Sequence, residues 1–139
     1  MFERILLAVD GSDHAMRAVK VAADLARCMK SELRIVVAFD PIPPYLGEPN
    51  LQDAINARLN DAQATLQKAV EQVGDLPGEL RTDLIEGNSA EVIIEVAKTR
   101  DSDLIVMGSR GLGRLAGLVL GSNSQKVVSH APCPVLIVR

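Results

Sequence analysis

Residues 104–124 read LIVMGSRGLGRLAGLVLGSNS, a short apolar strand that runs into a glycine-rich segment and ends at the start of a helix. Half of the ten glycines of the chain lie between positions 108 and 121. Glycine permits positive φ and leaves no Cβ between main-chain N–H groups and a ligand, while a helix start adds unpaired donors and partial positive charge. These properties favour an anion site, and phosphate is the ligand we expect.

Polar side chains accompany the glycines. Ser122–Ser124 supply donors at the expected helix start, and Arg110 and Arg114 supply the positive charge of the segment. The same residues also have an interpretation that needs no ligand. Ser122 and Gln125 have the spacing of a capping box at a helix start. Arg110 is equally consistent with a charged loop side chain in solvent. The spacing of these residues is consistent both with a phosphate site and with a turn and helix cap that bind no ligand.

Two familiar nucleotide motifs do not fit this segment. Residues 111–116 (GLGRLA) match the dinucleotide pattern G-x-G-x-x-A, but they follow the fourth strand of the chain, and no acidic residue ends a strand about 20 residues later. The pattern G-x-x-x-x-G-K-[ST] of P-loop NTPases is absent, and Lys126 is displaced from the position of its lysine. We therefore discount an NAD site and a P-loop.

The remainder of the chain alternates between strand and helix patterns. Apolar or alternating runs predict strands at 4–9, 33–39, 79–85, 104–107 and 135–138, and apolar residues at three- and four-residue spacing predict helices after Ser12, over 51–73, after Asn88 and over 122–129. Strands separated by helices are not hairpins. The pattern predicts a single α/β domain, residues 1–139, with an open five-stranded parallel sheet and helices on both faces.

Composition excludes several classes of function. A net charge of −3 and only three aromatic residues argue against nucleic-acid binding. No apolar run approaches the ~20 residues of a membrane span, and the first residues lack the layout of a signal peptide, so we expect a cytoplasmic protein. Two cysteines without metal-ligand spacing predict neither a disulfide scaffold nor a zinc site. His14 and His130 are interpreted as structural or surface groups.

The glycines also carry a family signature. The pattern G-x2-G-x9-G-[ST] is present as Gly108-Ser-Arg-Gly111, nine residues, and Gly121-Ser122. Together with the opening ILLAVDGSDHA (5–15), the strand end DLIVMG (103–108) and the ending APCPVLIV (131–138), it makes the chain resemble the universal stress protein (UspA-like) family, in its ATP-binding subgroup. The resemblance covers the whole chain. It implies a Rossmann-like sheet of order 3-2-1-4-5, similar to that of the adenine nucleotide alpha hydrolases.

The resemblance also implies a ligand and its contacts. The ligand is ATP, with AMP or ADP as alternatives, accompanied by Mg²⁺ or Mn²⁺ that Asp10 would help to hold through shared phosphate oxygens. Family members often carry Val in place of Asn123, so only a main-chain contact is implied there. The expected contacts follow the strand ends and the glycine segment: Ala8, Val9, Asp10, Phe39, Met107, Gly108, Arg110, Gly111, Gly121, Ser122, Asn123 and Ser124.

Asp10 has a second interpretation, because Asp-Gly-Ser is a common turn and is able simply to start the following helix. Its place where the sheet order reverses favours ligand contact, since open α/β sheets bind ligands outside the carboxyl ends of strands at that point. The sequence thus predicts that Asp10 and Gly108 face each other.

We expect a regulatory ATP-binding protein whose occupancy alters its surface or assembly for a protein partner. The alternative is a slow ATPase or a nucleotide-dependent transferase that uses the same pocket, although no catalytic base is evident beside the glycines. A third reading is a structural dimer module with an empty pocket, against which the intact glycine pattern argues. The apolar last strand, Val135–Val138, would lie at the sheet edge, and its pairing with a second copy predicts a homodimer.

Overall fold

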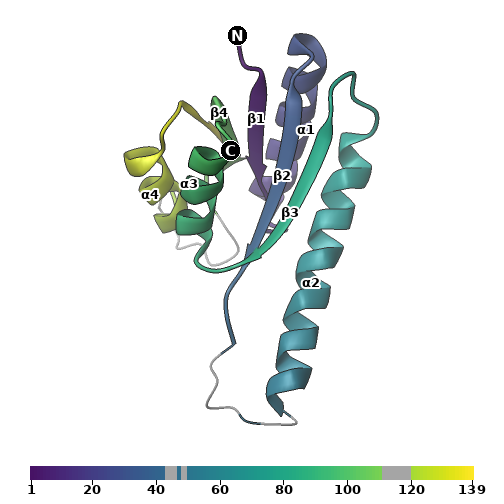
Figure 1. The fold of residues 1–139 in the computed structure, drawn as a ribbon, viewed down its shortest axis with the longest axis vertical. Helices are drawn as coiled ribbons and strands as arrows, with labels where there is room; N and C mark the ends of the chain where they lie inside the picture. Colours follow the sequence, from purple (N-terminus) through teal and green to yellow (C-terminus); the bar gives the residue numbers. More distant parts are fainter. Residues whose placement is uncertain (43–46, 48–49, 111–119) are drawn as a thin grey trace.

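A computed structural model describes residues 1–42, 47, 50–110 and 120–139. Five strands form one sheet of order β3-β2-β1-β4-β5, and every neighbouring pair is parallel (Figure 1). This arrangement confirms the α/β fold and the strand order, and each strand boundary lies within one residue of the predicted one. The strands are β1 Arg4–Ala8, β2 Glu32–Phe39, β3 Leu80–Glu86, β4 Leu104–Gly108 and β5 Val135–Val138.

The described residues form four helices, which cover the sheet in two pairs (Figure 1). The helices α1 (Asp13–Met29) and α2 (Asn50–Val73) lie on one face, and α3 (Ser89–Thr99) and α4 (Ser122–His130) lie on the other. Among the described residues, no helix has both the length and the apolar character needed to cross a bilayer.

Each face of the sheet has its own apolar core, because successive side chains of a strand point to opposite sides. Leu7 and Val106 belong to the core under α1 and α2, whereas Leu6 and Ile105 belong to the core under α3 and α4. All four are fully or almost fully buried. The three central strands are therefore apolar on both faces, which explains their short continuous apolar runs.

Side chains cap the starts of the first and third helices, at the residues after which the sequence predicts these helices. The hydroxyl oxygen of Ser12 accepts a hydrogen bond from Ala15 N at 3.2 Å, and Asn88 Oδ1 accepts one from Glu91 N at 3.2 Å. Such caps satisfy main-chain donors that a helix start otherwise leaves unpaired. They also fix the residues at which α1 and α3 leave the carboxyl edge of the sheet.

The start of α4 differs from the predicted capping box. Gly121, not Ser122, is the N-cap residue, and no side chain of the described residues accepts a hydrogen bond from the first turn. The side-chain amide of Gln125 instead donates to the carbonyl oxygen of Leu120 at 3.1 Å. The capping interpretation of Ser122 and Gln125 is therefore wrong, and the first N–H groups of α4 keep their capacity to donate.

Candidate functional site

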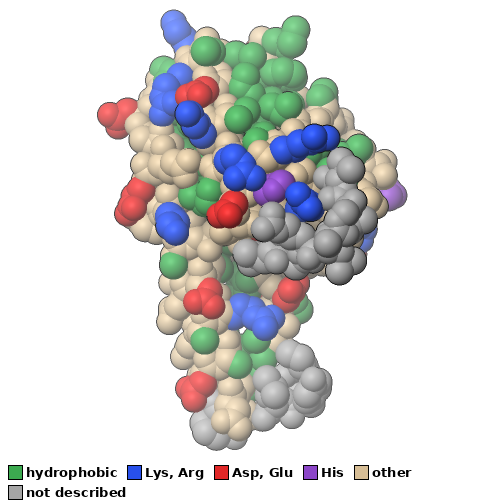
Figure 2. Space-filling view, turned by 180° about the vertical axis from the view of Figure 1, so that it is seen from behind, with side chains coloured by type: hydrophobic (Ala, Val, Ile, Leu, Met, Phe, Trp, Pro, Cys, Tyr) green, Lys and Arg blue, Asp and Glu red, His purple; other side chains and the backbone are tan. Residues whose placement is uncertain are grey.

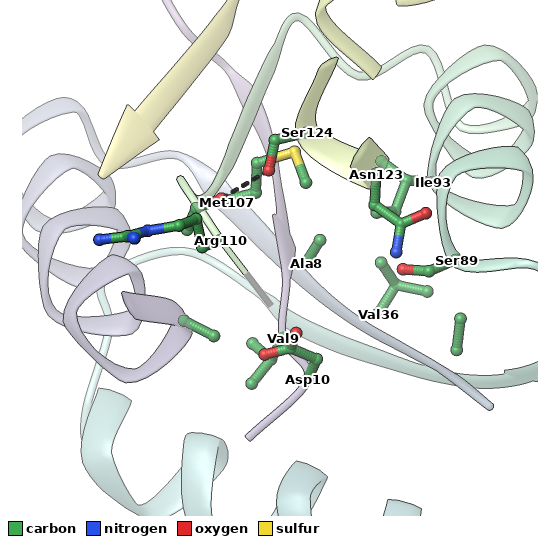
Figure 3. A pocket seen from close by; sticks show the side chains of 13 residues that line it. Ala8, Val9, Asp10, Val36, Ser89, Ile93, Met107, Arg110, Asn123 and Ser124 are labelled. Carbon is green, nitrogen blue, oxygen red and sulfur yellow. Dashed lines mark hydrogen bonds between the residues drawn. The ribbon is translucent and has the colours of Figure 1, made fainter. Parts of the chain in front are cut away.

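An open cavity lies at the carboxyl ends of β1, β2 and β4, between these strand ends and the first turns of α3 and α4 (Figure 3), and its empty space of about 430 Å³ includes the part open to solvent. The strand order reverses between β1 and β4, so the cavity occupies the position where open α/β sheets bind ligands. Its lining consists of Ala8, Val9, Asp10, Ala15, Val36, Ala38, Ser89, Ile93, Met107, Gly108, Arg110, Asn123 and Ser124.

The cavity gathers most of the residues that the sequence predicted. These come from the end of β1, the end of β4 and the start of α4: Ala8, Val9, Asp10, Met107, Gly108, Arg110, Asn123 and Ser124. Gly121 and Ser122 adjoin it in the chain but are not part of its lining. Gly111 and Arg114 lie outside the described residues.

Phe39 is not in the lining of this cavity. Its side chain packs against the core under α1 and α2, on the face of the sheet opposite to Ala8 and Met107. The strand alternation explains this placement, since Phe39 is an odd position of β2 and its even-numbered neighbour Ala38 points to the cavity side. The expectation that Phe39 borders the base finds no support in this geometry.

Asp10 both forms a turn and lines the cavity. Its Oδ1 accepts a hydrogen bond from Ser12 N at 3.0 Å, the geometry of an Asx turn at the start of α1. The hydroxyl of Ser12 donates to the carbonyl oxygen of Arg110 at 3.4 Å. The segments that follow β1 and β4 are thus joined directly, and the two interpretations of Asp10 are compatible.

The start of α4 is fixed against the end of β4 by two hydrogen bonds. Gly121 N donates to the carbonyl oxygen of Ser109 at 2.7 Å, and the hydroxyl of Ser124 donates to the carbonyl oxygen of Gly108 at 2.9 Å. Ser124 is buried, so its hydroxyl proton is used within the protein. This hydroxyl therefore positions the helix, and a contact of Ser124 with a ligand stays a prediction.

Packing alone requires a glycine at position 108. A Cβ at this position would lie 2.9 Å from main-chain atoms of both His14 and Ala15, closer than real Cβ contacts allow. His14 is itself buried at 6% exposure, with Nδ1 2.5 Å from the hydroxyl oxygen of Ser109. The first turn of α1 thus lies directly against the end of β4. The pattern G-x2-G-x9-G-[ST] contains three glycines. Packing of the fold is sufficient to explain one of them, Gly108.

Arg110 lines the cavity, but its side chain extends toward α1 (Figure 3). Its Nε is buried and has no hydrogen-bond partner in the part of the chain that the structure describes. A contact of the Arg110 guanidinium with a ligand stays a prediction.

The first turn of α4 forms a polar wall of the cavity, with Asn123 and Ser124 in the lining. The N–H groups of Ser122, Asn123 and Ser124 belong to the helix start, where no intrahelical acceptor exists, and the described residues provide no side-chain cap. The turn also contains no acidic residue. Its partial positive charge and unpaired donors suit an anion such as a phosphate.

Sequence reasoning missed the α3 side of the cavity, which Ser89 and Ile93 provide. A signal was present: the Asn88 cap places Ser89 in the first turn of α3, and that turn follows the carboxyl end of β3. All helix starts that follow parallel strands meet at one edge of the sheet. Val36 and Ala38 were also missed, although the alternation along β2 assigns both to this face.

A metal site made by protein groups alone is not present among the described residues, which contain no cluster of three or more His, Cys, Asp or Glu side chains. Asp10 is the acidic residue of the lining. One carboxylate suits a Mg²⁺ ion that takes its other ligands from phosphates and water.

Comparison with known proteins agrees with the fold. The model of the universal stress protein family matches residues 1–139. A universal stress protein of Thermus aquaticus is 49% identical over 139 residues, which cover 100% of both chains. The structure of the universal stress protein UspA from Lactobacillus plantarum matches with a TM-score of 0.89 at 29% identity, covering 99% of this chain and 98% of that one. A universal stress protein solved in complex with cAMP matches with a TM-score of 0.76 at 26% identity, covering 99% and 97%.

Proposed function

The chain belongs to the universal stress protein family, and on this premise we propose that it is a cytoplasmic regulatory protein that binds ATP in the cavity between β1 and β4. Nucleotide occupancy alters its surface or its assembly, and so its interaction with a protein partner. A related structure holds cAMP, which makes an adenine nucleotide the natural class of ligand.

One observation carries the proposal: the uncapped first turn of α4 lies at the wall of a cavity whose floor is apolar. The floor includes Ala8, Val36 and Met107, which suit the rings of a nucleoside. The unpaired N–H groups of Ser122–Ser124 suit its phosphates. A site with both properties matches a nucleotide better than a purely polar or a purely apolar ligand.

A nucleotide bound in this cavity would carry a divalent metal ion at its phosphates. Mg²⁺ or Mn²⁺ would be held by Asp10 together with phosphate oxygens, because a lone carboxylate is an insufficient site for either ion. When bound, the metal neutralises part of the phosphate charge. ADP and AMP would use the same nucleoside contacts with fewer phosphate contacts.

The enzyme reading, a slow ATPase or transferase, is the second candidate. Efficient phosphoryl transfer requires a positioned nucleophile and a group that orients it. In the lining, Asp10 is the one carboxylate, and one of its oxygens accepts a hydrogen bond from Ser12 N. Steady turnover in the range of about 1–100 s⁻¹, lost on substitution of a lining residue, would favour this candidate.

A homodimer completes the proposal. In the described structure β5 pairs with β4 alone, so its outer edge presents unpaired N–H and C=O groups. The side chain of Leu136 on this strand is 37% exposed. Natural proteins rarely leave such an edge uncovered. The same strand of a second copy, paired antiparallel about a two-fold axis, would cover both edges at once.

The direct test of the function is to identify the ligand that the protein carries. Freshly purified protein would be denatured, and the released small molecules analysed by mass spectrometry and HPLC. We expect ATP or another adenine nucleotide at a substantial fraction of the protein concentration. A protein that releases no nucleotide and binds none of ATP, ADP, AMP or cAMP in titration would contradict the proposal.

A further inference from the structure

We propose that the outer edge of β3 pairs with the same edge of a second copy of the chain, antiparallel and centred on Thr82. β3 ends the sheet on the side opposite to β5, and in the described structure it pairs with β2 alone. This second interface involves neither the nucleotide cavity nor the β5 edge. It therefore goes beyond the dimer of the proposed function and would join such dimers to one another.

The main chain of β3 offers hydrogen bonds to a neighbour at alternate residues. Leu33 N of β2 donates to Glu79 O at 2.9 Å, so the odd-numbered residues from 79 onward bond to β2. The even-numbered residues Leu80, Thr82 and Leu84 therefore direct their N–H and C=O groups away from the sheet. In an antiparallel pair centred on Thr82, this residue lies opposite its own copy and Leu80 lies opposite Leu84. The outward groups of these residues then exchange the hydrogen bonds of an antiparallel ladder.

The middle of β3 is accessible to a second strand. Arg81 and Thr82 are exposed. Leu80 and Leu84 lie on the same face as Thr82 and pack against the core under α1 and α2, whereas Figure 1 shows α3 and α4 beside β4, away from β3. The backbone at Thr82 is therefore open on the side that would meet a second copy.

Charges on the other face of β3 are complementary in this arrangement. Arg81 and Asp83 are two residues apart and so lie on the same face of the sheet. When Thr82 lies opposite its own copy, Arg81 lies opposite Asp83 of the second copy, and Asp83 lies opposite Arg81 of the second copy. One two-fold axis thus creates two cross-strand pairs of opposite charge, which stabilise antiparallel strands.

Both charged side chains have capacity for a further partner. Asp83 Oδ2 accepts a 2.7 Å hydrogen bond from Arg34, and Asp83 Oδ1 has no hydrogen bond among the described residues. Arg81 is 53% exposed, and its ion pairs with Glu32 and Glu79 are surface pairs of the kind that contributes little to stability. Replacement of these pairs by an intermolecular pair therefore costs little.

The same charges oppose the neighbouring registers. Pairing centred on Arg81 would place two guanidinium groups opposite each other, and pairing centred on Asp83 would place two carboxylates opposite each other. Like charges directly opposite destabilise a strand pair. Charged side chains on an edge strand usually prevent association with other chains. On β3 their order favours one partner, a second copy of β3 in the register centred on Thr82.

The test uses Leu136→Lys, in which the β5 edge carries a charge, so that β3 is the edge left to pair. An interface of so few residues is weak, so we expect a monomer at about 10 µM and a growing fraction of dimer up to about 1 mM. Sedimentation equilibrium measures the dissociation constant. Amide hydrogen exchange followed by NMR should show protection of Thr82 and Leu84 that rises with protein concentration.

Thr82→Pro in this background removes the central outward N–H, and proline is tolerated where an edge strand faces solvent. We expect it to weaken the dimer about tenfold or more, since two hydrogen bonds are lost across the two-fold axis. Thr82→Val is the matched control, because it keeps the N–H and the branched Cβ, and it is expected to keep the dissociation constant. Arg81→Glu sets like charges opposite each other and is expected to weaken the dimer about tenfold.

Two results would overturn the inference. One is a protein that stays monomeric over the whole concentration range, and the other is a dimer that both Thr82→Pro and Arg81→Glu leave unchanged. Circular dichroism and thermal melts show whether the variants are folded, and if Thr82→Pro is not, the exposed Arg81→Glu decides. The outcome is separate from the proposed function, because ATP titration of the same variants measures nucleotide binding on its own.

Discussion

The main-chain N–H of Gly121 donates a 2.7 Å hydrogen bond to the carbonyl oxygen of Ser109. This bond returns the chain to the end of β4 at the point where α4 begins. It places the uncapped first turn of α4 beside the end of β4. The candidate phosphate site is therefore built on two rigid elements.

Gly121→Val is expected to weaken ATP binding about tenfold or more, the equivalent of one lost hydrogen bond to a charged group. The branched side chain would stand next to the N–H groups that face the phosphates. Gly121 has φ −69° and ψ 164°, a backbone conformation open to any residue, so the fold should survive. Titration with ATP and a thermal melt of the unliganded variant measure the two effects. A variant that binds ATP normally would show that the phosphates lie elsewhere.

ATP is expected to raise the melting temperature of the wild type, and more so with Mg²⁺ than with EDTA. A ligand that binds only the native state stabilises it by about 2.7 kcal/mol at a hundredfold excess over Kd. For a domain of this size, that corresponds to a shift of roughly 5–20 °C. Differential scanning fluorimetry measures the shift. If millimolar ATP leaves the melt unchanged, the binding proposal fails.

Gly108→Ala is expected to destabilise the protein by about 1–3 kcal/mol, the usual cost of forcing extra volume into a packed region. The added Cβ would meet main-chain atoms of His14 and Ala15 at 2.9 Å, and backbone yields less readily than a side chain. Urea denaturation measures the change. A variant of wild-type stability that has lost ATP binding would instead show that this glycine serves the ligand.

Leu136→Lys is expected to convert a dimer into a monomer, because it places a charge at the centre of the β5 edge. Light scattering at micromolar concentration measures the mass. ATP binding should persist, since the cavity lies at β1, β2 and β4 within one chain. Val128→Lys is the control: Val128 is also exposed, at 49%, but lies on α4. A monomeric wild type would contradict the proposed assembly.

The two cysteines are expected to react at different rates. Burial raises the pKa of the Cys133 thiol, and the negative charge of Asp103 raises it further. A higher pKa means less thiolate at neutral pH, and the thiolate is the reactive form. Cys28 is exposed. Titration with a thiol reagent at pH 7 should show one fast and one slow group, with the fast one absent in Cys28→Ser. Equal rates would contradict this assignment.

Much of the fold follows from the sequence because its signals are local. The apolar runs at β1 and β4, the Ser12 and Asn88 caps and the strand and helix alternation each depend on residues close together in the chain. Alternating strands and helices admit few topologies, since parallel crossovers are almost always right-handed. The resemblance to the family then supplied the strand order, which the structure confirms.

The tertiary structure decided how individual side chains are used. Phe39 packs against the core under α1 and α2, Ser124 holds α4 to Gly108 O, and Arg110 extends toward α1, placements that the sequence did not indicate. These outcomes depend on contacts between segments far apart in the chain, which local patterns do not encode. For the same reason Ser89 was missed: only the assembled sheet brings the start of α3 to the cavity. The sequence by itself determined the elements and their order, and the packing between them determined which groups are free to meet a ligand.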